Sequence, residues 1–250
     1  MIADHRREGK DVGSLVNARA HKWTPLHEAS NRGHADAITA LVEGGAVVDQ
    51  VTQSDGKSSL IIASELGHTE AVKVLLAAGA SVDWAREGGG TALICACEQG
   101  FLDVVELLLD RGADVKQTRP DGGTALMYAC QNGHRDVAEL LLDRDADVGQ
   151  VMKDGTTALM YACQNGHRDV VDLLLDRGAD VGQIRPDGGT ALMAARYAGH
   201  DDMAELLLSR GADGNEDGGP GTQPSPPRVS ADAPHRAELG SRRLAVRTST

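Results

Sequence analysis

The chain has 250 residues, only six of them aromatic, and its 37 Asp and Glu against 25 Lys and Arg give a formal net charge of −12. So few aromatic side chains favour short stacked units over one large globular core. The acidic balance disfavours a nucleic-acid ligand, because phosphate backbones attract basic surfaces, and no window approaches the roughly 18 apolar residues of a membrane span.

Residues 1–20 come before a repeating pattern and are predicted to form a degenerate N-terminal cap. Residues 8–12, with the sequence Glu-Gly-Lys-Asp-Val, look like the remnant of one repeat. Gly9, however, lies 24 residues before Gly33, nine short of the period found in the rest of the chain. These first residues contain no apolar stretch of signal-peptide length.

Residues 21–214 repeat with a period of 33, apart from one step of 34. Each unit contains a triplet such as Thr-Ala-Leu and, later, a Gly-His or Gly-Phe pair. The triplets begin at Thr24, Ser58, Thr91, Thr124, Thr157 and Thr190, and the pairs begin at Gly33, Gly67, Gly100, Gly133, Gly166 and Gly199. A fixed period of this length predicts a stacked array, in which each unit buries its apolar face against its neighbours. The predicted units cover about 21–53, 54–86, 87–119, 120–152, 153–185 and 186–214.

One unit predicts two short antiparallel helices and a hairpin-like loop. In the fourth unit, residues 120–123 (Pro-Asp-Gly-Gly) have the composition of a turn. Thr124 stands where a helix N-cap belongs, ahead of a short helix with an apolar face. The pair at 133–134 ends that helix, and a second, amphipathic helix follows. Neither helix is long enough to be stable alone, so stacking must stabilise both.

The first unit, with Thr-Pro-Leu-His-Glu-Ala at 24–29 and Gly-His at 33–34, resembles the ankyrin repeat. The family's Leu-Leu-x-x-Gly-Ala ending recurs at 75–80, 108–113, 174–179 and 207–212. The resemblance covers more than three quarters of the chain. It implies an all-α ankyrin-repeat solenoid of paired short antiparallel helices with β-hairpin-like loops, used as a non-enzymatic protein-binding scaffold or adaptor.

Three departures from the family pattern matter. The family's His after Thr-Pro-Leu, which braces the turn, is kept only at His27, so later units are expected to rely on apolar contacts. The Asn that usually follows Asp-Val is replaced in later units, which leaves only Asn17 in that role. Asp145 replaces the Gly that ends the second helix elsewhere, and we expect a left-handed backbone there.

No catalytic, metal or cofactor site is predicted. The loop histidines could form a metal-binding ladder, but a metal needs several ligands that converge on one point, so we prefer hydrogen-bond bracing. Cys97, Cys130 and Cys163 share one repeat position and would lie about 8–10 Å apart, too far for a disulfide. Reduced thiols predict an intracellular protein, cytoplasmic or nuclear. Every candidate reactive group recurs in several units, whereas an enzyme needs one distinctive site.

The resemblance implies that a partner protein or peptide binds the concave side, which is built from the loop tips and the exposed end of each first helix. The matching positions are Trp23, Asn31, Arg32, Asp55, Lys57, Glu65, Glu87, Glu98, Gln99, Asp121, Gln131, Asn132, Asp154, Gln164, Asn165, Asp187 and Tyr197. Aromatic residues dominate hot spots, which makes Trp23 and Tyr197 candidate anchors, although Trp23 could equally cap the first unit.

Four of these positions, Gln131, Asn132, Gln164 and Asn165, are expected to form an exposed ladder of amides. The acidic positions favour a basic partner, although a solvated acidic face explains the same charge. We expect a monomer that binds no nucleic acid and no membrane.

From about residue 215 the periodicity stops, and Pro-Ser-Pro-Pro at 224–227 with an Arg-rich end indicates a disordered tail over 215–250. An alternative to an independent scaffold is a fragment or ankyrin module of a larger multidomain protein, such as a kinase, a channel or a ubiquitin-ligase adaptor, with no activity of its own. Nothing outside 15–214 predicts a second folded domain, which favours the scaffold.

Overall fold

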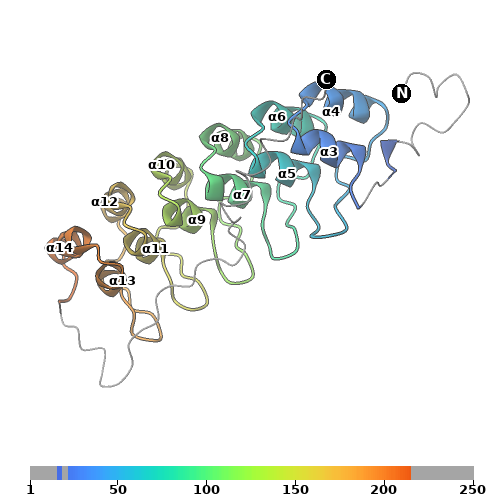
Figure 1. The fold of residues 1–250 in the computed structure, drawn as a ribbon. Coiled ribbons are helices and arrows are strands. Elements are labelled where there is room, and N and C mark those ends of the chain that lie inside the picture. The colour runs from blue at the N-terminus through green and yellow to red at the C-terminus, as the bar shows by residue number, and fades with distance from the viewer. Residues whose placement is uncertain (1–15, 19–21, 215–250) are drawn as a thin grey trace, which may run out of the picture.

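The computed structural model describes residues 16–18 and 22–214, so the predicted tail and most of the predicted cap lie outside the described residues. Twelve α-helices in this part pair up and stack into an elongated solenoid (Figure 1). The first helices of the pairs, here called inner, are α3 (Pro25–Asn31), α5 (Ser59–Glu65), α7 (Ala92–Gln99), α9 (Ala125–Gln131), α11 (Ala158–Gln164) and α13 (Ala191–Tyr197). The second helices, here called outer, are α4 (Ala35–Glu43), α6 (Thr69–Ala77), α8 (Leu102–Asp110), α10 (Arg135–Asp143), α12 (Arg168–Asp176) and α14 (Asp201–Ser209). The predicted all-α solenoid of paired short helices is confirmed.

Every inner helix begins at a Thr or Ser N-cap. Thr124 Oγ1, for example, accepts the backbone N–H of Met127 at 3.2 Å, and such a cap typically contributes about 1 kcal/mol. In α3 the cap is reciprocal, because His27 Nδ1 accepts the backbone N–H of Thr24 at 3.0 Å. His27 Nε2 also donates to the carbonyl of Gln50 at 2.7 Å. The predicted bracing role of this histidine is therefore confirmed.

The core is one continuous layer between the inner and outer rows. Inner helices contribute small side chains such as Ala129, fully buried, which let neighbouring helices approach closely. Outer helices contribute larger ones such as Leu141, also fully buried. Because each helix has only seven to nine residues, its stability depends on this packing and not on its own hydrogen bonds.

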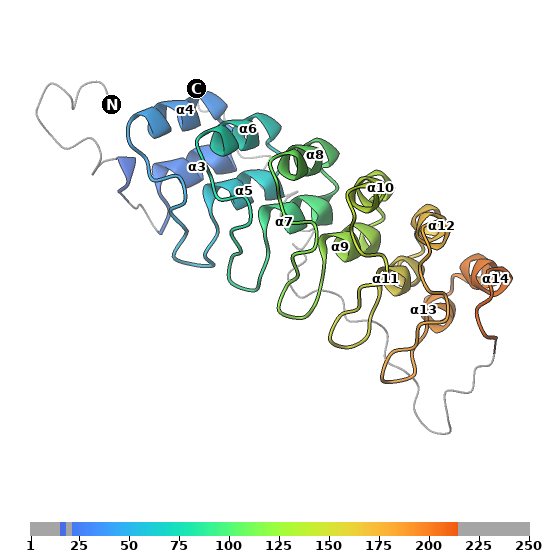
Figure 2. The ribbon, with the colours of Figure 1, turned by 180° about the vertical axis from the view of Figure 1, so that it is seen from behind.

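The loop between one pair and the next is hairpin-like, as predicted. Isolated antiparallel bridges join Val51 to Ser58, Thr118 to Thr124 and Val151 to Thr157, and no sheet forms among the described residues. In the loop of the fourth unit the backbone N–H of Gly123 donates to Asp121 Oδ1 at 2.9 Å, and Gly122 has a φ of +90°. Figure 2, seen from behind, shows these loops projecting from the side of the inner row.

A second contact joins each unit to the next at the Gly-His pairs. The ring of His134 packs against Gly100 and its Nε2 donates to the carbonyl of Glu98 at 3.2 Å. His167 does the same with Gly133 and the carbonyl of Gln131, at 3.1 Å. The histidines therefore brace the loops by hydrogen bonds, as the sequence predicted.

Asp145 has a φ of +66°, in the left-handed region, as expected from the Gly at the equivalent place in other units. Gly178, one period later, has a φ of +86° and open space where a Cβ would be. Asp145→Gly is therefore expected to raise the free energy of unfolding by roughly 1 kcal/mol. Chemical denaturation measures the change, with Gly178→Asp as the reverse variant. A lower midpoint for Asp145→Gly would contradict this account.

Candidate functional site

The tips of the hairpin-like loops and the exposed ends of the inner helices, here called the candidate surface, run the length of the array. Asp121, Asp154 and Asp187 occupy the same place in three successive loops. Each accepts the backbone N–H two residues further on, at 2.9 to 3.0 Å. The loops are also tied to one another, since the N–H of Lys153 donates to the carbonyl of Asp121 at 2.9 Å. The three carboxylates are thus held in one repeated geometry.

The predicted acidic and basic residues of the second unit form a local network. Lys57 Nζ lies 2.6 Å from a carboxylate oxygen of Glu65 and 3.6 Å from one of Asp55. Burial acts to lower the pKa of Lys57, but the hydrogen bond and charge of Glu65 outweigh it, and the pKa is raised. Burial acts to raise the pKa of Asp55, but hydrogen bonds from Thr52 and Ser54 and the charge of Lys57 lower it overall. The ammonium group of Lys57 therefore forms ion pairs with two carboxylates of the same unit.

The expected ladder of exposed amides is only partly present. Gln131 is 8% exposed and Glu98 is 9% exposed, so the expectation that these side chains face solvent is wrong. The histidine of the next unit donates a hydrogen bond to the backbone carbonyl of each. Asn132 and Asn165 are exposed, and each donates through its Nδ2 to a carbonyl one turn earlier in its own helix, at 2.9 Å. Gln99 and Gln164 are half-buried.

The two candidate anchors differ in exposure. Tyr197, the last residue of α13, is 54% exposed and free to contact a partner. Trp23 is half-buried and packs edge-on against His27, with ring centroids 6.2 Å apart. Packing of this kind suits the capping interpretation of Trp23. Nearby, Asn31 and Arg32 are exposed, and Arg32 pairs with a glutamate of its own helix at 2.6 Å.

Two features near the loops were not predicted. Tyr128 is buried, and the guanidinium of Arg119 lies over its ring at 5.0 Å, while Arg119 Nε donates to the carbonyl of Gly88 at 3.2 Å. Burial raises the pKa of Tyr128. Trp84 is 41% exposed on the flank of a loop and its Nε1 donates to the carbonyl of Gly56 at 3.0 Å. The sequence did contain a signal for the burial of Tyr128. Cys95 occupies the equivalent position one unit earlier, and cysteine is among the residue types most often buried.

Most of the acidic charge within helices lies away from the candidate surface. The six outer helices contain 15 Asp and Glu and three Lys and Arg, whereas the inner helices contain three and one. On the candidate surface itself, Lys57 and Arg185 each pair with acidic neighbours. Any preference for a basic partner at this surface therefore depends on a few placed carboxylates and not on its total charge.

The four cysteines are buried and free. Burial raises the pKa of Cys95 to about 11 and that of Cys163 to about 12, and raises those of Cys97 and Cys130 as well. Because the thiolate is the reactive form, we expect no reaction of the native protein with Ellman's reagent at about pH 8. All four thiols should react once guanidinium unfolds the chain. A thiol that reacts within seconds in the native protein would contradict the packing described here.

The described residues also set limits on other chemistry. Within them, no group of three or more His, Cys, Asp or Glu side chains is placed to hold a metal ion. No helix in residues 16–18 and 22–214 is long and apolar enough to cross a membrane.

Comparison with known proteins identifies the family. A model described as "Ankyrin repeats (3 copies)" matches residues 5–86, 83–152 and 144–217. The crystal structure of the human ASB11 ankyrin repeat domain is 32% identical, with a TM-score of 0.69, over 76% of this chain and 85% of that one. A search of curated proteins found no significant match. With paired helices, hairpin-like loops and a family model that spans most of its length, the chain belongs to the ankyrin repeat family.

Proposed function

We propose that this chain is a non-enzymatic scaffold or adaptor whose candidate surface binds a partner protein or peptide that carries basic side chains. Ankyrin repeats generally bind proteins. The observation that carries the proposal is the row formed by Asp121, Asp154 and Asp187, each fixed by the same turn. Carboxylates held in place by the loop lose little side-chain entropy when they bind a cation.

The spacing of the row suggests the form of the partner. Neighbouring units are about 8–10 Å apart, and a polyproline II chain advances about 3.1 Å per residue with three residues per turn, so every third side chain points the same way. A bound chain in this conformation with Lys or Arg at every third position would therefore meet successive carboxylates. Tyr197 lies exposed at the end of α13, in the same unit as Asp187, and offers an aromatic contact to an apolar residue of the same partner.

The test compares two sets of three substitutions with equal charge change. The first set is Asp121→Asn, Asp154→Asn and Asp187→Asn, in which Asn can still accept the turn hydrogen bond. The control set is Asp114→Asn, Asp147→Asn and Asp180→Asn, equivalent residues that cap the opposite flank of the loops at 2.9 Å. Both sets have a period of 33, but Asp187 also pairs with Arg185 at 2.9 Å, so the unfolding midpoint of each variant is measured first and binding is compared between folded proteins.

Peptides selected on the unmodified protein from a random display library provide the probe. They should be enriched in Lys or Arg three positions apart and should bind the first variant about tenfold more weakly. Their affinity for the control variant should stay unchanged. Equal losses in both variants would indicate unspecific charge attraction, and no loss in either would move the binding surface elsewhere; both outcomes reject the proposal.

A further inference from the structure

Two of the polar contacts that join neighbouring units occupy different parts of the array, and both recur with the repeat. Neither belongs to the candidate surface, because one lies in the segment that follows an outer helix and the other at the last turn of the outer helices. Their distribution divides the array at the interface between α8 and α10.

The first contact, here called the loop link, joins a side chain to the backbone of the next unit. Asn17 Oδ1 accepts the N–H of Val47 at 2.8 Å, as expected for the only Asn at this position. Asp49 Oδ1 accepts the N–H of Ser81 at 2.9 Å. Asp83 Oδ1 accepts the N–H of Asp114, also at 2.9 Å. Asn17 is the only Asn at this position, and aspartate makes the same contact in the next two units.

After the third unit the loop link stops. In the next three units the same position is occupied by Lys116, Gly149 and Gly182. The lysine ammonium group can only donate hydrogen bonds, and glycine has no side chain, so none of the three can make the loop link. The backbone N–H of each instead donates to the aspartate two residues earlier in its own loop, at 2.9 Å. At this position the later units are thus bonded internally and not to one another.

The second contact, here called the helix link, begins where the loop link ends. Arg144 pairs with Asp110 at 3.0 Å, 34 residues earlier in the chain. Arg177 pairs with Asp143 at 2.8 Å and Arg210 with Asp176 at 3.0 Å, again 34 residues apart. Arg111 has the equivalent place one unit earlier, but the residue 34 positions before it is Ala77, which has no carboxylate.

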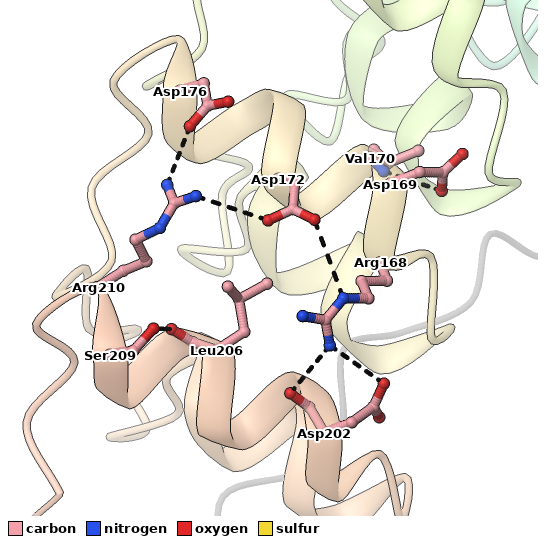
Figure 3. Close-up of polar contacts among 9 residues, drawn as sticks. All are labelled: Arg168, Asp169, Val170, Asp172, Asp176, Asp202, Leu206, Ser209 and Arg210. Atoms are coloured by element: carbon pink, nitrogen blue, oxygen red, sulfur yellow. Dashed lines mark hydrogen bonds and ion pairs between the residues drawn. The ribbon is translucent and has the colours of Figure 1, made fainter.

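At the end of the array the helix link widens into a network (Figure 3). Arg210 lies between Asp172 and Asp176 of α12, at 3.6 and 3.0 Å. Arg168 of α12 reaches Asp202 of α14 at 3.3 Å and Asp172 at 4.0 Å. These side chains are 39% to 70% exposed, so dissolved ions have access to every pair.

We propose that the array is a conformational device with two parts that respond differently to ionic strength. Units from α3 to α8 are coupled by loop links, which are short-range contacts between a side chain and a backbone dipole. Units from α8 to α14 are coupled by helix links between full charges. Salt screens exposed charges strongly, since the Debye length falls from about 10 Å at 0.1 M to about 3 Å at 1 M. The C-terminal part therefore loosens with salt while the N-terminal part keeps its coupling.

Hydrogen exchange of the full chain measures this difference, because local opening of a unit exposes its helix amides. Raising NaCl from about 0.1 M to about 1 M should speed exchange in α12 and α14 roughly three- to tenfold relative to α4 and α6. Arg177→Gln should remove the part of the salt response of α12 that comes from its coupling to α10, while the pairs of Arg168 and Arg210 still couple α12 to α14. Arg111→Gln is the matched control, with the same chemical change at a position that has no helix link, and should leave the response unchanged.

A transplanted loop link makes the test sharper. Gly149 has no positive φ, and a Cβ there meets only Asp147 Oδ1 at 3.5 Å, so the position accepts a side chain. Gly149→Asp added to Arg177→Gln should slow exchange in α12 relative to Arg177→Gln alone at both salt concentrations. An equal salt response of both parts, or a salt response of α12 that Arg177→Gln leaves unchanged, would overturn the proposal.

Discussion

Gly133→Ala is expected to lower the free energy of unfolding by roughly 2–4 kcal/mol, from left-handed strain and overpacking together. Gly133 has a φ of +76°, and a Cβ there would lie 2.5 Å from Nδ1 of His167. His167 cannot easily move away, because its Nε2 donates to the carbonyl of Gln131 at 3.1 Å. Either the ring or the backbone of the neighbouring unit must shift, and the stack loses contact on both sides.

Gly178→Ala separates the two causes of this loss. Its φ is +86°, but no atom lies within 4 Å of a Cβ built there, so only the backbone strain of about 1 kcal/mol remains. Guanidinium titrations of both variants give the difference. A double variant that adds His167→Ala should recover part of the loss through a coupling between the two sites. Equal losses in Gly133→Ala and Gly178→Ala would show that the ring does not restrict this glycine.

The fold could be predicted because every unit repeats the same local sequence signals. Thr124 and Thr157 cap equivalent helices, and the glycines that end the helices adopt the expected left-handed conformation. Local preference, apolar pattern and turn composition all favour the same structure, which is the condition under which sequence specifies a fold. Asp145 illustrates the point, since its backbone follows its glycine equivalents despite the side chain.

The candidate surface was harder to predict because its exposure depends on neighbouring units. Gln131 belongs to a polar position on a short helix, yet it is buried, and His167 of the following unit donates to its backbone carbonyl. Asp49 bonds to a backbone amide 32 residues away, a contact that no single unit reveals. A pattern that repeats predicts each unit well, but the contacts that cross from one unit to the next depend on pairs of residues one period apart.

Deletion of residues 124–156, one complete period, is expected to leave a folded and shorter array. The deletion joins Gly123 to Thr157, and because 157–167 repeats 124–134 without change, the new sequence is the same as the original across the joint. The helix link also survives. After the deletion Arg177 takes the place of Arg144, 34 residues after Asp110, and can pair with that aspartate. In a linear array each unit contacts only its neighbours, so the remaining contacts should re-form.

The free energy of unfolding should fall by roughly 2–5 kcal/mol, at about 0.05–0.15 kcal/mol for each residue removed. The denaturant slope should fall by about one sixth, because it scales with the surface that unfolding exposes. Guanidinium titration followed by circular dichroism gives both quantities. Deletion of residues 124–140 is the control, because it removes α9 and part of α10 and leaves the following units out of register. If both deletions cost the same, the period is not the unit of stability, and the additive account of this array fails.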